Sequence, residues 1–101
     1  MDTMRFLHEL LSSKKLQLLI DRKVCFTSKG TELNELFCSI VGVSADRLNR
    51  KLTLMLSSPR FNQYRELKMI DCTFDEIKSG LNKWFAVVDE NLYLVGSLEI
   101  L

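Results

Sequence analysis

The feature that most constrains the fold of this chain is the segment 31–57, in which two helically spaced apolar runs flank a glycine. Thr31 is placed to cap the first run, Gly42 to end it in a left-handed conformation, and Ser44 to cap the second. The apolar positions are Leu33, Leu36, Phe37, Ile40 and Val41 in the first run, and Ala45, Leu48, Leu52, Met55 and Leu56 in the second. Two capped helices joined by a tight turn predict a helix-turn-helix over about 31–57.

The turn and the second run resemble a known family. Residues 42–52 read Gly-Val-Ser-Ala-Asp-Arg-Leu-Asn-Arg-Lys-Leu, similar to the G-V-S-x-x-x-L-x-R-x-L run of bacterial helix-turn-helix regulators, the AraC type most and the LacI type slightly less. A fainter resemblance, through residues 30–52 and 61–67, is to the RteC-type regulators of mobile elements. The resemblance implies a DNA-binding transcriptional regulator whose helix from Ser44 to Ser57 reads the major groove.

Polar side chains on the exposed face of that helix suit nucleic acid. Arginine can bind guanine with two hydrogen bonds and asparagine can bind adenine in the same way, while lysines position the protein on phosphates. The predicted DNA-contacting residues are Arg47, Asn49, Arg50, Lys51, Thr53 and Arg60. The alternative is that these residues form only the solvated face of an ordinary helical hairpin.

The remaining segments predict more helices and one β-hairpin. Helical spacing covers residues 2–12, 16 to about 22, 60–69 and 73–84, with a short extended piece at 24–26. Two β-rich runs, 85–88 and 92–95, surround three turn-forming residues. The predicted fold class is therefore mainly α with a C-terminal β-hairpin. Residues 14–26 leave open whether the layout is winged-helix-like or a plain bundle.

Length and charge narrow the possible functions. The chain has 101 residues, 47% of them apolar, which fits one domain, 1–101. Its net charge is only +1, which excludes a histone-like polycation. Residues 1–68 carry 12 positive and 7 negative side chains, net +5, whereas residues 69–101 carry 2 and 6, net −4. The first two-thirds could therefore face a polyanion, and the acidic last third could not.

Catalytic and metal-binding patterns are missing from the sequence. It has one histidine, His8, and neither a glycine-rich phosphate loop nor a G-x-S-x-G motif. Cys25, Cys38 and Cys72 are too widely spaced for a common zinc site. We expect no enzyme activity, metal or cofactor. Without an apolar run of about 18 residues or a secretory signal layout, we also expect a cytoplasmic protein with no membrane partner.

Two functional hypotheses follow from these observations. The first is a small bacterial transcriptional regulator that binds double-stranded DNA as a homodimer, since one helix-turn-helix seldom gives enough affinity alone. The second is a non-enzymatic protein-interaction module or accessory subunit that uses the acidic C-terminal third. The first requires binding that weakens steeply with salt and depends on Arg50, and the second requires neither.

Overall fold

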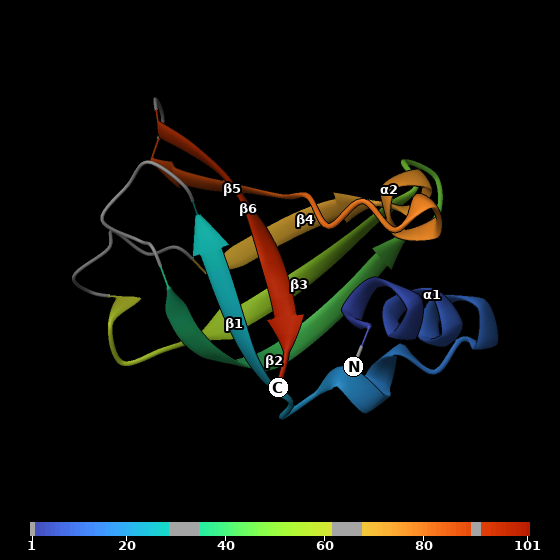
Figure 1. The fold of residues 1–101 in the computed structure, drawn as a ribbon, viewed down its shortest axis with the longest axis horizontal. Coiled ribbons are helices and arrows are strands. Elements are labelled where there is room, and N and C mark those ends of the chain that lie inside the picture. The colour runs from blue at the N-terminus through green and yellow to red at the C-terminus, as the bar shows by residue number, and fades with distance from the viewer. Residues whose placement is uncertain (1, 29–34, 62–67, 90–91) are drawn as a thin grey trace.

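The structure, a computed structural model, is a closed antiparallel barrel whose six strands neighbour one another in sequence order (Figure 1). It describes residues 2–28, 35–61, 68–89 and 92–101. The strands are β1 (Lys23–Ser28), β2 (Leu36–Asp46), β3 (Lys51–Ser57), β4 (Met69–Thr73), β5 (Trp84–Asp89) and β6 (Leu92–Ile100). The helix α1 (Thr3–Ser13) and the 3₁₀ helix η1 (Leu16–Leu19) precede β1, and the helix α2 (Phe74–Ser79) connects β4 to β5. The prediction of a mainly α fold, winged-helix-like or bundled, is wrong.

The segment predicted to be a helix-turn-helix is the β2–β3 hairpin. Its strands pair from Ser39↔Ser57 to Asp46↔Lys51, with a register shift between Ile40 and Gly42. Every second residue of β3 is buried, which places three leucines, Leu52, Leu54 and Leu56, on the core face. A helix would turn the middle leucine away from the other two, whereas a strand buries all three. The predicted helices at 31–41 and 45–57 are therefore wrong over the described residues, and residues 31–34 lie outside them.

The turn between the two predicted helices is also different. Among the described residues, Gly80 is the one glycine with a positive φ, so Gly42 does not end a helix in a left-handed conformation. Ser44 lies within β2 and pairs with Thr53, so it does not cap a helix.

Other predictions are confirmed. Asp2 caps α1 by accepting a hydrogen bond from Arg5 N at 3.2 Å. Thr73 caps α2 in a capping box with Glu76, although the helix ends at Ser79 and not near residue 84. The C-terminal hairpin is β5–β6.

Residues 16–22 form only the short η1 before β1 begins, and most of the predicted helix 60–69 lies outside the described residues.

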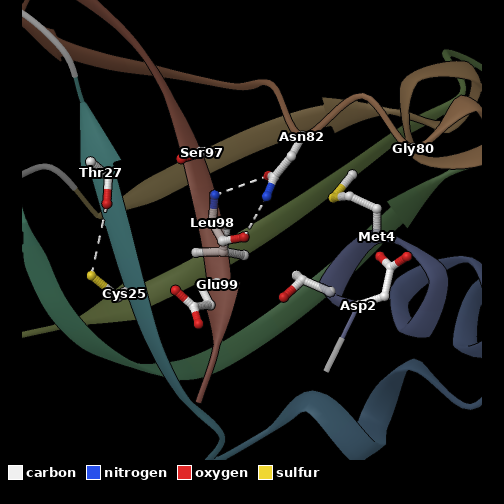
Figure 2. A pocket seen from close by; sticks show the side chains of 10 residues that line it. Asp2, Met4, Cys25, Thr27, Gly80, Asn82, Ser97, Leu98 and Glu99 are labelled. Atoms are coloured by element: carbon white, nitrogen blue, oxygen red, sulfur yellow. Dashed lines mark hydrogen bonds between the residues drawn. The ribbon is translucent and has the colours of Figure 1, made fainter.

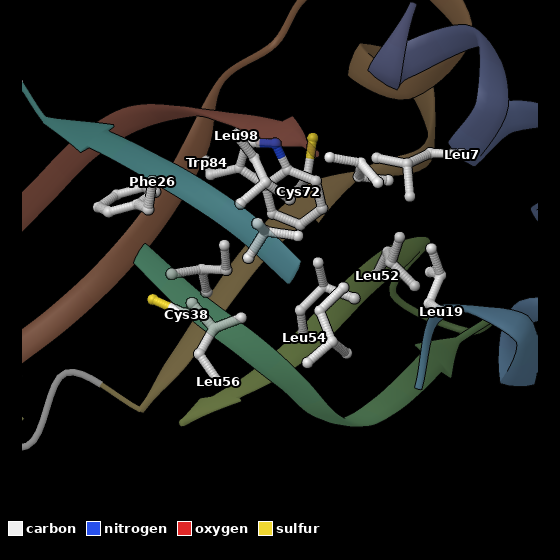
Figure 3. Packing of buried hydrophobic residues seen from close by; sticks show 14 of the residues in the cluster. Leu7, Leu19, Phe26, Cys38, Leu52, Leu54, Leu56, Cys72, Trp84 and Leu98 are labelled. Atoms are coloured by element: carbon white, nitrogen blue, oxygen red, sulfur yellow. The ribbon is translucent and has the colours of Figure 1, made fainter. Parts of the chain in front are cut away.

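The core fills the barrel and continues to α1 at one end. Figure 3 shows Leu7 of α1 near Cys72, and Leu19 beside Leu52. Trp84, a fully buried side chain, lies between the strands at the centre of the cluster. Burying an apolar side chain of this kind stabilises a fold by about 1.5–3 kcal/mol, and α1 contributes several at once. The helix therefore acts as a lid on the barrel core.

On one side, the last residues of β6 are hydrogen-bonded by side chains and not by a neighbouring strand. Pairing of β5 with β6 begins at Trp84↔Gly96, so Leu98 and Ile100 extend past it. The Asn82 side chain takes the missing strand's place: its Nδ2 donates to Leu98 O at 2.7 Å and its Oδ1 accepts from Leu98 N at 2.9 Å. The same Oδ1 accepts from Trp84 Nε1 at 2.9 Å. Thr3 Oγ1 accepts from Ile100 N at 3.1 Å, which ties α1 to the same edge.

We expect Asn82→Ala to lower the free energy of unfolding by about 2–3 kcal/mol, because three polar groups lose their partner in a partly buried place. Urea denaturation measures this change. Asn49→Ala is the matched control: its side chain is exposed and bonds only within its own turn, and we expect a loss below about 1 kcal/mol. Equal losses in the two variants would contradict the role given to Asn82.

Candidate interaction surface

The structure gathers four of the six predicted DNA-contacting residues at the tip of the β2–β3 hairpin. The turn holds Arg47, Asn49 and Arg50, and β3 begins with Lys51. The other two do not join them: Thr53 lies further along β3, and Arg60 lies in the connection between β3 and β4. These residues are thus presented by a β-turn and a strand, and the prediction that a helix carries them is wrong.

The tip is held in shape by one carboxylate. Asp46 Oδ1 accepts from Leu48 N and from Asn49 N, each at 3.1 Å, and its Oδ2 accepts from Asn49 Nδ2 at 2.7 Å. The bonds from Asn49, backbone first and then side chain, lower the pKa of the Asp46 carboxyl below its ordinary 3.8. The Asn49 side chain is therefore engaged within the turn.

Arg50 fastens the tip to α2. Its backbone is left-handed, with φ 54, and its carbonyl oxygen accepts from Phe74 N at 2.9 Å. Its Nη2 donates to Asp75 Oδ1 at 3.0 Å, and its guanidinium lies 6.0 Å from the centroid of the Phe74 ring. Thr53 is engaged as well, since its Oγ1 donates to Asp71 Oδ1 at 2.5 Å. Three of the predicted DNA-contacting side chains, Asn49, Arg50 and Thr53, thus donate hydrogen bonds to aspartates of this chain.

A protruding apolar side chain remains at the tip. Leu48 is 91% exposed, the highest exposed fraction among the large apolar residues described. Arg47 and Lys51, on either side of it, are exposed cations. The tip therefore offers one leucine and two positive charges on a turn whose backbone is fixed from within.

A group of exposed apolar side chains lies elsewhere, on the outside of the barrel. Strand register brings Met55 beside Met69, and Phe85 beside Val95. These side chains and that of Val87 point away from the core and are 36–57% exposed. We call the five residues Met55, Met69, Phe85, Val87 and Val95 the β3–β6 patch. Contiguous apolar patches of a few hundred Å² mark interaction sites on soluble proteins.

Sequence reasoning missed this patch because it assigned Met55 to the buried face of a helix. The signal that could have found it is the strict alternation of leucine with other residues over 51–57, which is the period of a strand with one solvent-facing side. Positions 53, 55 and 57 then face outward. The relation of Met55 to Met69 needs the β3–β4 register, which the sequence does not specify.

A hollow of about 400 Å³ lies on the outer face of β1 and β6, beside the start of α1 and the end of α2. Figure 2 shows Asn82 bonded to the backbone of Leu98 there, with Cys25 and Thr27 on the neighbouring strand. No buried side-chain nitrogen or oxygen among the described residues lacks a hydrogen-bond partner. The hollow is therefore built around satisfied structural bonds.

Two of the thiols, Cys38 and Cys72, are poorly suited to nucleophilic catalysis. Burial raises the pKa of Cys38 and of Cys72 to about 12, with the negative charge of Glu76 adding to the effect at Cys72. In the described part of the chain no three His, Cys, Asp or Glu side chains come together as metal ligands could. Nor does any helix there have the length and apolar character needed to cross a membrane.

Comparison of the chain with protein-family models, curated proteins and solved structures finds no match. The tip, the patch and the hollows are therefore the features of the molecule that bear on its function.

We expect the Asp46 carboxyl to titrate below its ordinary 3.8 in the folded protein, as followed by carbon-13 NMR. The hydrogen bonds that the Asp46 carboxylate accepts stabilise the fold fully above the unfolded pKa of about 3.9. This stabilisation is lost as the pH falls through the lower pKa of the folded protein. Asn49→Ala removes one of these bonds and should move the midpoint part of the way back. Arg47→Ala, the control, should leave it in place. A midpoint at or above the ordinary value would contradict the described turn.

Proposed function

We propose that this chain is a non-enzymatic protein-interaction module that binds a second copy of itself through the β3–β6 patch. The observation that carries the proposal is the patch: five large apolar side chains, on four neighbouring strands, each more than a third exposed. Four of the five, all except Met55, come from the C-terminal third of the chain. The outer surface of that third supports a docking role through its apolar side chains rather than through its acidic charge.

A second copy suits this surface on three grounds. Apolar contact is non-directional, so an apolar patch is complementary to itself across a two-fold axis. The chain carries a net charge of only +1, so two copies repel each other weakly. A second hollow, lined in part by Phe85 of the patch, also contains Lys51, Asp71 and Lys83, whose charges of both signs can pair between copies.

The size of the patch sets the expected strength. Five side chains per copy are far fewer than the roughly 20–30 residues that each partner contributes to a standard stable complex. The dimer should therefore be weak, with monomer and dimer both populated over accessible concentrations. Self-association of this kind shows as a concentration-dependent mass.

We expect sedimentation equilibrium from about 5 to 500 µM to show a reversible monomer–dimer equilibrium. The double variant Met55→Glu with Val95→Glu should weaken the dimer at least about tenfold, because it buries like charges in the interface. The matched control, Phe37→Glu with Leu81→Glu, makes the same charge change at exposed apolar residues outside the patch and should leave the dissociation constant unchanged. A wild-type chain that stays monomeric at every concentration would end this proposal.

DNA binding through the β2–β3 tip is a second candidate. It is favoured by the placement of exposed Arg47 and Lys51 around a protruding Leu48. β-Ribbons can enter a DNA groove, and apolar side chains at their tips can wedge between base steps. Because Asn49, Arg50 and Thr53 are engaged within the chain, such contacts would be mainly to phosphates.

For this candidate we expect fluorescence anisotropy to show duplex DNA binding at about 50 mM salt that weakens sharply at about 200 mM. Arg47→Ala with Lys51→Ala should reduce the slope of log affinity against log salt by about 2. Lys14→Ala with Lys15→Ala removes two exposed cations at the end of α1 and serves as the control. Absence of binding by the folded protein at low salt would exclude this candidate.

A further inference from the structure

The seam between β4 and β5 is the least paired place in the barrel. Among the described residues these two strands share a single register pair, Asp71↔Phe85, whereas β3 and β4 share five. Figure 1 shows β4 and β5 close together near α2 and diverging toward the end where β4 begins and β5 finishes. The barrel is therefore closed at one end of this seam and splayed at the other.

Strand alternation shows which backbone groups face the splayed part. Leu56 N donates to Lys68 O at 2.7 Å, so the backbone of residue 68 faces β3 and that of Met69, the next residue, faces the seam. Residue 71 faces the seam by the same alternation, so Asp71↔Phe85 is a hydrogen-bonded pair and the backbone of residue 85 faces β4. Residue 87 follows at the same period, and its backbone also faces the seam.

Met69 and Val87 would be the next pair after Asp71↔Phe85, but the ladder does not extend to them. Their side chains are 57% and 53% exposed and belong to the β3–β6 patch. On its other side Val87 is opposite Tyr93 of β6, the last pair before the register shifts between Val87 and Asp89. The end of β5 therefore presents a strand edge and an apolar side chain at the same position, the combination that accepts an added strand.

We propose that the second copy docks by edge pairing, with the β5 strands of the two copies running antiparallel across a two-fold axis near Val87. This rests on the proposed self-association and specifies how it occurs. The pairing links the two barrels at Val87, where each copy offers one N–H and one carbonyl oxygen, and it brings the two Val87 side chains together. Edge pairing is isologous because each copy contributes the same strand, and it adds main-chain hydrogen bonds to a patch too small for a stable interface alone.

One substitution acts only on the seam-facing edge of β5. Val87→Pro removes the N–H that faces the seam, and the pairing of β5 with β6 does not use that N–H. Val87→Thr is the control, since it keeps the N–H and the β-branched shape. In sedimentation equilibrium we expect the proline variant to weaken the dimer at least about tenfold relative to the threonine variant.

A second measurement uses the wild-type chain and does not depend on whether the proline variant folds. Hydrogen exchange at the Val87 amide should slow at least about fivefold as the concentration rises through the dimer range. A mixture of labelled and unlabelled copies should show nuclear Overhauser contacts between copies at β5. The amide of Phe85, which pairs within the chain, should not change with concentration.

The outcomes separate the two proposals. A wild-type chain that never dimerises removes the proposed function, and edge pairing with it. A dimer whose affinity is the same in both Val87 variants, with Val87 exchange independent of concentration, retains the function and overturns edge pairing. Val87 exchange that is slow even in the monomer also overturns edge pairing, because the seam would then be closed within one chain.

Discussion

The structure depends on the pairing of β1 with β6, because this contact turns a row of antiparallel strands into a barrel. It joins residues 24–28 to residues 96–100 through five register pairs. Closure removes the two free edges of the sheet and makes an enclosed core possible. A Cβ at Gly96 would collide with the carbonyl oxygen of Thr27 and the ring of Phe26. The β1–β6 pairing therefore depends on the absence of a side chain at Gly96 as much as on the contacts that the other residues of the two strands make.

What the sequence predicts correctly is what neighbouring residues decide. The start of α1 follows from the capping side chain of Asp2, and the capping box of α2 lies within four residues, Thr73 to Glu76. The β5–β6 hairpin follows from two β-rich runs joined by a short turn. In each of these the hydrogen-bonding partner lies close along the chain, so a local pattern suffices.

The β2–β3 hairpin was not predicted because its apolar positions fit two periods. Leu36 and Ile40 are four residues apart, as on a helix face, and with Cys38 they are also alternate buried residues of a strand. The choice between the periods is made by partners far along the chain: β1 pairs with β2, and β4 pairs with β3. The predicted site failed for the same reason. Arg50 and Thr53 meet their acids, Asp75 and Asp71, across 25 and 18 residues, and no local pattern shows those acids.

Closure between the two ends of the described chain also constrains how the protein acquires its fold. β1 has no β6 to pair with until residues 29–91 and β6 itself have been made, and Thr3 binds Ile100 across 97 residues. Topologies dominated by such distant contacts fold on timescales of about milliseconds to seconds, well behind local helices and hairpins. On the ribosome, α1 and β1 therefore emerge well before their partner β6. Until it arrives, the edge of β1 and the apolar face of α1 are open to other proteins, so this interval is when the chain most needs protection from aggregation.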